Sequence, residues 1–206
     1  MAFQSIKEAI LSQRLHSGKI YTELNLAKEL GISKTPVREA LLDLASKGFI
    51  EYLPRRGFKI NLLNEKEIRD LYEFRTALEK EVIRHITPLI NHNHIKKLED
   101  LHNEVKAATQ ICDTTAFMKI DREFHMYLTG LTENKYIIEA LAHIRDFCDW
   151  LGSKALITMS DLIEFKDQHA KIIDGLKHGD VQRAKMAMEE HISKTQQTVL
   201  DHLKMK

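Results

Sequence analysis

The 206-residue sequence lacks the features that mark membrane-spanning and secreted proteins. It contains no run of about 18 apolar residues, so no helix is expected to cross a membrane. The N-terminus has no apolar stretch of the signal-peptide kind, and we therefore expect the chain to stay in the cytoplasm. With 43% hydrophobic and 30% charged residues, the composition suits one large globular domain or two modest ones.

Cysteine and proline are both scarce, with two and three residues respectively. Neither Cys112 nor Cys148 belongs to a Cys-x-x-Cys pair or a Cys/His cluster, which argues against a thiolate metal site or a catalytic thiol. Both fall on the apolar stripes of expected helices. We therefore expect two buried, reduced thiols and no disulfide.

Positive and negative residues nearly balance over the whole chain, but the net charge differs between its two parts. Residues 1–63 hold 10 Lys+Arg and 6 Asp+Glu, a net charge of +4, whereas residues 64–206 hold 21 and 24, a net charge of −3. A basic first segment before an acidic remainder suggests that only the first segment meets a polyanion.

The sequence of residues 1–63 predicts short helices and strands joined by tight turns. Helices are expected over residues 5–15, 22–30 and 35–47, and strands over 49–52 and 58–62. Two short helices joined by a glycine-containing turn are typical of a helix-turn-helix, and the hairpin after them is typical of a wing. Residues 1–63 are therefore predicted to form a winged helix-turn-helix DNA-binding domain.

The second helix of such a motif places its N-terminal residues near base edges in the major groove. Arg38 can donate two hydrogen bonds to guanine, and Lys34 and Thr35 can reach phosphate or bases. The residues at this helix start are Ser33, Lys34, Thr35, Val37 and Arg38, and those at the wing tip are Arg55, Arg56 and Gly57. A helical protein-interaction module is the alternative, but the cations gather at these two places and favour DNA.

The sequence of residues 64–206 predicts helices throughout. Helices are expected near residues 65–87, 93–112, 115–130, 135–152, 160–177 and 180–203. Short connections between them predict an antiparallel bundle of about six helices over residues 64–206. The fold class is therefore mainly α, with a winged helix-turn-helix followed by an all-helical domain.

Four polar residues lie on the inward stripes of these helices. Asp121 and His125 are four residues apart on one helix face, and His169 and His191 each lie on the stripe of another helix. A divalent cation could coordinate the carboxylate and the three neutral imidazoles together. The alternative is a core network of hydrogen bonds without a metal, and His102, also on an apolar stripe, shows that periodicity alone does not select the ligands.

Arg75 lies on the core-facing stripe of the helix at 65–87, where a guanidinium needs an anion. Glu79, one turn later, is one candidate partner, and a ligand carboxylate is the other. Arg145 lies near a stripe beside Leu141 and Cys148, and we rank it below Arg75.

The motif GISKTPVREALLDLASKGFI followed by RRGFKI closely resembles the GntR family of bacterial regulators over residues 4–62. This resemblance implies DNA contacts from Lys34, Thr35, Arg38 and Gly57, made by a homodimer on a short palindrome. The chain departs from the family pattern at Lys34, where many members have Arg, and at Leu24, where some members have an Arg that contacts DNA.

The motifs LYEFRTALE, DREFH, QHAKIIDGLKHGD and AMEEHI resemble the FCD ligand-binding domain, in its shorter vanillate-regulator-like form, over residues 65–203. The resemblance implies a metal on Asp121, His125, His169 and His191, and an effector pocket that Arg75 faces.

These observations predict a metabolite-responsive transcriptional regulator, a repressor that binds double-stranded operator DNA as a homodimer. A divalent ion such as Zn, Ni or Mn is expected in the second domain, with a small organic acid as the effector. The alternative is a metalloenzyme that carries a DNA-binding domain. We expect no enzyme, because the sequence has no separate motif for a general base or a nucleophile.

Overall fold

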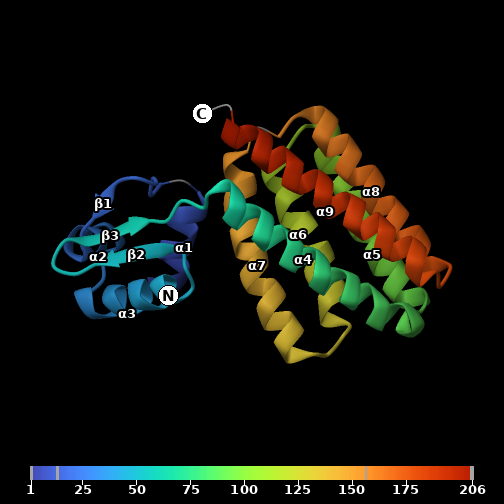
Figure 1. The fold of residues 1–206 in the computed structure, drawn as a ribbon, viewed down its shortest axis with the longest axis horizontal. Coiled ribbons are helices and arrows are strands. Elements are labelled where there is room, and N and C mark those ends of the chain that lie inside the picture. Colours follow the sequence, from blue (N-terminus) through green and yellow to red (C-terminus); the bar gives the residue numbers. More distant parts are fainter. Residues whose placement is uncertain (1, 13, 156, 205–206) are drawn as a thin grey trace. The chain divides into compact units, whose positions relative to one another are not determined.

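The computed structural model describes residues 2–12, 14–155 and 157–204. The chain folds as two units, Met1–Asn64 and Glu65–Lys206. Figure 1 shows helices and a small sheet in the first unit and helices throughout the second. The expected fold class is confirmed.

The first unit contains three helices and a three-stranded antiparallel sheet among its described residues. The strand order is β1-β3-β2, and Leu53 pairs with Gly57 where the β2–β3 hairpin turns. The two-residue strand β1 was not expected, because it is too short to show a period-two pattern. The elements are α1 (Ala2–Leu11), β1 (Ile20–Tyr21), α2 (Glu23–Leu30), α3 (Lys34–Ser46), β2 (Ile50–Leu53) and β3 (Gly57–Ile60).

Local signals fix the sharp turn between α2 and α3. The Thr22 side chain accepts a hydrogen bond from the Asn25 backbone N–H and caps the start of α2. Gly31 ends α2 in the left-handed region at φ 66°, and its N–H donates back to the last turn. The core beneath this turn consists of side chains that are at most 1% exposed, namely Ile6, Ile10, Val37, Leu41, Leu44, Phe49 and Phe58.

The hairpin between β2 and β3 requires glycine at position 57. The φ of Gly57 is +119°, and a Cβ atom there would lie 2.0 Å from the Tyr21 carbonyl oxygen. Any side chain at this position would therefore push β1 away from β3. This steric limit explains why a glycine ends the Arg55-Arg56-Gly57 tip.

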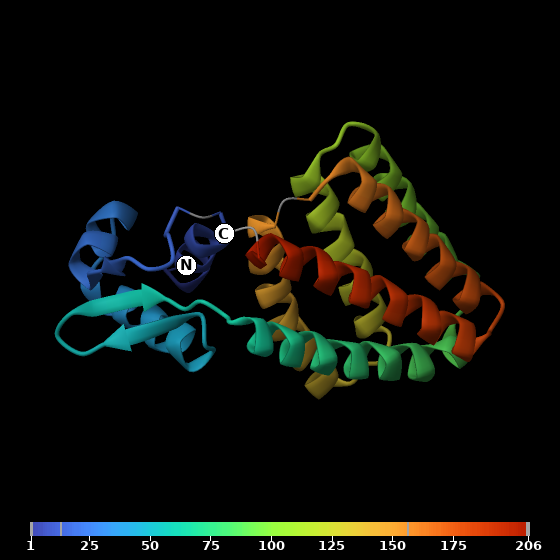
Figure 2. The same cartoon turned by 45° about the horizontal axis from the view of Figure 1, so that its top comes forward.

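The second unit is a helical bundle in which α9 runs along both α8 and α4 (Figure 2). Each helix begins and ends within two residues of its expected position. Gly175 of α8 lets α9 approach closely, because a Cβ atom there would lie 2.7 Å from the Ala184 nitrogen. The helices are α4 (Glu65–Ile86), α5 (His92–Gln110), α6 (Thr114–Gly130), α7 (Lys135–Lys154), α8 (Met159–Lys177) and α9 (Val181–Lys204), with the 3-10 turn η1 (Thr87–Leu89) after α4.

Cys148 is buried on α7, as expected, but the prediction that Cys112 is buried is wrong. Helix α5 ends at Gln110, so Cys112 lies in the following turn at φ 53° and points to solvent. None of the described helices combines the length and the apolar composition needed to cross a membrane.

Candidate DNA-binding surface and metal site

The N-terminal turn of α3 presents a polar, exposed edge. Ser33 stands at the N-cap position, and Lys34, Thr35 and Arg38 are all exposed. Val37 is fully buried, so its inclusion among the groove-facing residues is wrong. Its position is set by the 3.6-residue period, which turns Val37 and Leu41 to the core and leaves Arg38 outside.

Lys34 forms an ion pair with Glu23, a buried carboxylate that the sequence analysis did not identify. Glu23 of α2 is 9% exposed, lies 3.3 Å from the Lys34 ammonium, and accepts a hydrogen bond from the Tyr52 hydroxyl of β2. The hydrogen bond from Tyr52 is the main cause that lowers the pKa of Glu23, and burial opposes it. Glu23 therefore links α2, the start of α3 and the hairpin.

The β2–β3 hairpin carries its two arginines outward. Arg55 and Arg56 are both exposed, Arg55 has a φ of 63°, and the Arg56 backbone N–H donates to the Leu53 carbonyl at 3.0 Å. Leu24, on the same helix as Glu23, is 55% exposed. The structure thus exposes Lys34, Thr35, Arg38 and the hairpin arginines, and it adds an exposed apolar side chain on α2.

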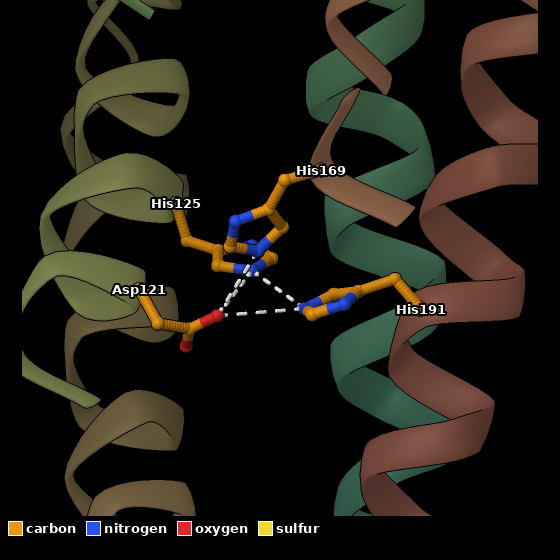
Figure 3. A group of neighbouring side chains, drawn as sticks. All are labelled: Asp121, His125, His169 and His191. Atoms are coloured by element: carbon orange, nitrogen blue, oxygen red, sulfur yellow. Dashed lines mark hydrogen bonds and ion pairs between the residues drawn. The ribbon is translucent and has the colours of Figure 1, made fainter. Parts of the chain in front are cut away.

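In the second unit, three helices bring one carboxylate and three imidazoles together (Figure 3). Asp121 and His125 come from α6, His169 from α8 and His191 from α9, and each is at most 7% exposed. Their ligand atoms all lie within 4.8 Å of one another. The helical stripes seen in the sequence therefore converge on one point.

The spacing of these atoms suits a first-row divalent ion. The Asp121 Oδ1 atom lies 3.1 Å from His169 Nε2 and 3.6 Å from the Nε2 atoms of both His125 and His191. Ligands about 2.0–2.1 Å from a tetrahedral zinc ion lie about 3.3 Å apart. The donor set therefore fits such an ion without a large movement of the helices.

Hydrogen bonds outside the cluster orient two of the rings. The Glu79 carboxylate contacts His125 Nδ1, and the Gln168 side-chain oxygen lies 3.3 Å from His191 Nδ1. Both acceptors require a proton on Nδ1, which leaves the Nε2 lone pair of each ring facing the cluster. The two Nε2 atoms lie 3.1 Å apart, an arrangement that needs a cation or a proton between them.

His169 has a different environment. Neither of its ring nitrogens makes a hydrogen bond with any described residue, although Nε2 lies 3.1 Å from Asp121 Oδ1. The ring stacks on Phe124 with 4.4 Å between centroids, and it is fully buried. With the proton on Nδ1, coordination of an ion would give the Nε2 lone pair, which faces the Asp121 carboxylate, a favourable partner.

The pKa shifts of Asp121, His169 and His191 favour the protonation states that bind metals. Burial lowers the pKa of His191 to about 3 and also lowers that of His169, against the attraction of Asp121. Burial opposes ionisation of Asp121, but the charge of Arg145 and the contacts with His125 and His169 together hold the pKa of that carboxyl well below its usual range. Neutral imidazoles and an ionised carboxylate are the forms that coordinate cations.

Two buried arginines flank the cluster. Arg75 donates from Nε to Glu79 at 2.7 Å, and its Nη2 lies 3.4 Å from His125 Nε2. Arg145 of α7, ranked second in the sequence analysis, pairs with Asp121 through its Nη2 and is equally buried, at 1% exposed. The sequence pattern could not show this pair, because the contact joins different helices.

A small cavity of about 20 Å³ adjoins these groups. Its polar lining includes both arginines, Asp121 and His191, and its remaining walls come from α6, α7, α8, α9 and the α7–α8 connection. A space of this size holds about one water molecule. The apolar part of the lining includes Phe117, Met118, Cys148, Ile157, Phe165 and Val199.

His102 lies outside the group that could hold an ion. It is 8% exposed on α5, its Nδ1 has no hydrogen-bond partner among the described residues, and burial lowers its pKa to about 4. Gln168 was missed by the sequence analysis because glutamine is usually exposed, yet it is only 2% exposed here.

Comparison with known proteins gives a consistent result. The profile of the FCD domain family matches residues 70–194, and that of bacterial regulatory proteins of the gntR family matches residues 1–60. The Nta operon transcriptional regulator of Aminobacter aminovorans is 31% identical over 144 residues, 68% of each chain. The HTH-type transcriptional repressor RspR of Escherichia coli is 22% identical and covers 96% of this chain and 86% of its own.

The fold also matches a solved structure over its whole length. The E. coli protein McbR/YncC superposes with a TM-score of 0.83 at 19% identity, and the match covers 99% of this chain and 96% of that one. The named relatives are transcriptional regulators, which agrees with the expectation of a regulator over that of an enzyme. The chain belongs to the GntR family of DNA-binding transcriptional regulators and carries an FCD effector domain.

Proposed function

We propose that this chain is a metal-dependent, metabolite-responsive repressor. The observation that carries the proposal is the meeting of Asp121 with three imidazoles at 3.1–3.6 Å in a buried core. In a core without an ion, the Nε2 lone pairs of His125 and His191 would face each other and repel. The ion, Zn, Ni or Mn by its donor set, supplies a fixed positive charge that attracts an anion.

The DNA contacts are assigned to α3 and the hairpin. Arg38 is placed to read base edges, Lys34 and Thr35 to contact phosphate or bases, and the tip at 55–57 to contact phosphate or the minor groove. A homodimer would present two such units to a palindrome with half-sites about one helical turn apart. The name of RspR, a repressor, supports repression as the direction of control.

The effector proposed is a small carboxylate bound beside the ion, with Arg75 as a receptor. Arg75 borders the small cavity and is fully buried, and a guanidinium binds carboxylates through paired hydrogen bonds. Binding would shift the dimer between arrangements of high and low affinity for the operator, provided that the acid binds them unequally.

Metal analysis of the purified protein tests this function. We expect one divalent ion per chain, retention of two chains in a native mass spectrum, and loss of the ion in His169→Ala. His102→Ala is the matched control, because it removes a buried imidazole outside the cluster and should leave the metal content unchanged. Full metal occupancy in the alanine variants of His125, His169 and His191 alike would contradict the site.

A further inference from the structure

Among the described residues of the first unit, Glu23 is the only charged side chain that is buried. It is the first residue of α2, is 9% exposed, and accepts a hydrogen bond from the Tyr52 hydroxyl through one carboxylate oxygen. The other oxygen lies 3.3 Å from the ammonium of Lys34, the first residue of α3. A fixed negative charge therefore lies at the start of the helix to which the DNA contacts are assigned.

The stability of the fold does not explain why residue 23 carries a charge. A buried carboxylate costs free energy, and an ion pair adds little stability when its cation is as exposed as Lys34, whose side chain is 62% exposed. A glutamine would accept the same hydrogen bond from Tyr52 without a charge. The charge of Glu23 therefore acts mainly on the cations beside it.

Two of these cations lie on the outer face of α3. Lys34 and Arg38 are four residues apart, so they are neighbours on the helix surface, and both are exposed. The hydrogen bond from Tyr52 is the main cause that lowers the pKa of Glu23, and the charges of both cations lower it further against the effect of burial. The carboxylate thus attracts both exposed cations at the start of this helix.

A lysine on a helix that reads DNA does not by itself select a base. Its ammonium is a point charge on a flexible stem, and such a charge binds phosphate whatever the sequence. Glu23 holds the Lys34 ammonium in one place, occupies one of its N–H donors, and repels a phosphate that approaches it.

We propose that Glu23 is a positioning residue for sequence recognition. It directs the ammonium of Lys34 to a base edge in the major groove, where guanine O6 and N7 accept hydrogen bonds, and away from phosphate. This inference rests on the assignment of α3 to the DNA contacts proposed above, and it concerns sequence specificity.

The variant Glu23→Gln tests the proposal, because its amide oxygen can still accept the hydrogen bond from Tyr52. The probes are a duplex that the unmodified protein selects from a randomised library and a duplex with that sequence scrambled. Titrations of the full-length protein at several salt concentrations should show a fall of about tenfold in the ratio of the two affinities. Affinity for the scrambled duplex should rise, and its salt dependence should steepen by about one released ion, because a freed Lys34 contacts phosphate.

Glu29→Gln is the matched control, since it removes the same charge from an exposed glutamate of the same helix. It should change the affinities for the two duplexes by similar factors and keep their ratio within about twofold of that of the unmodified protein. If Glu23 served folding alone, Glu23→Gln would weaken the binding of both duplexes and would not steepen the salt dependence.

The variant Lys34→Ala gives a second test that does not depend on the folding of Glu23→Gln. An ammonium held at a base edge predicts a loss of about tenfold in affinity for the selected duplex and little change for the scrambled one. When Lys34 is already alanine, the further change Glu23→Gln should leave the ratio of the two affinities unchanged.

The outcomes distinguish this inference from the proposed function. Failure of the unmodified protein to select any duplex would overturn sequence-specific DNA binding itself. An affinity ratio in Glu23→Gln equal to that of the unmodified protein would overturn the role of Glu23 and leave the regulator standing. Equal losses of affinity for both duplexes in Lys34→Ala would make Lys34 a phosphate contact and would also overturn the inference.

Discussion

Glu79 of α4 contacts the Nδ1 atom of His125 across the helix interface, although the two residues are 46 positions apart. Because the carboxylate only accepts, His125 must carry its proton on Nδ1 and present Nε2 to the cluster. Burial opposes ionisation of Glu79, but the interactions with His125 and Arg75 hold its pKa below the usual range. Glu79 thereby sets the tautomer of a proposed ligand without being one.

We predict that Glu79→Gln lowers metal affinity roughly 10- to 100-fold, because partners of this kind orient the ligating ring and raise its basicity. A competition assay with a metal-binding dye measures the change. Glu81→Gln, which alters a half-buried glutamate paired with Arg84 on the same helix, should leave the affinity unchanged. Equal metal affinity in the two variants would show that the Glu79–His125 contact has no part in coordination.

His102 gives a pH dependence that is separate from the cluster. Its pKa is lowered to about 4 by burial, whereas in the unfolded chain it is near 6.5. Below about pH 6.5 the unfolded chain binds a proton that the folded protein excludes, so stability should fall as the pH drops from 6.5 towards 4.

Replacement of His102 by glutamine removes this titration. Between about pH 7.5 and pH 5 the unmodified protein should lose on the order of 1–2 kcal/mol more stability than His102→Gln. Urea unfolding of both proteins, after metal removal by chelation, measures the difference. Parallel pH profiles of the two proteins would show that His102 is freely protonated in the folded state.

Much of this architecture follows from periodicity alone. Stripes of apolar residues predict each helix of the bundle within two residues of its ends and place Asp121, His125, His169 and His191 inside it. Periodicity does not show which other helix packs against each apolar stripe.

The remaining features depend on contacts between distant segments. The pairing of Arg145 with Asp121, of Gln168 with His191, and of Glu23 with Tyr52 each joins two elements whose packing the sequence does not reveal. Cys112 was misplaced for a local reason, because the helix ends two residues before it and the stripe does not continue.

The hairpin tip allows a test of sequence-independent binding. We predict that Arg56→Ala weakens specific and non-specific DNA binding by similar factors and reduces the salt dependence of binding, because an exposed cation there contacts phosphate. Titrations at several salt concentrations with operator and unrelated DNA measure both effects. A change of sequence preference at constant overall affinity would instead assign Arg56 to base recognition.

Arg38 is predicted to behave in the opposite way. Its side chain is exposed in the second turn of α3, where Val37 beside it is fixed in the core, so the helix holds it at a constant angle to the groove. Loss of a two-point contact with guanine should cost about 1–3 kcal/mol of binding free energy, enough to remove discrimination at that base pair. Arg38→Ala should therefore lose specific binding and keep most non-specific binding, with unchanged thermal stability because the residue makes no core contact.

The matched control for Arg38→Ala is Glu39→Ala, which truncates the neighbouring exposed side chain of the same helix and should not lower operator affinity. The affinities for operator and unrelated DNA are measured at one fixed salt concentration. An unchanged ratio of the two affinities in Arg38→Ala would show that this residue does not contact bases specifically.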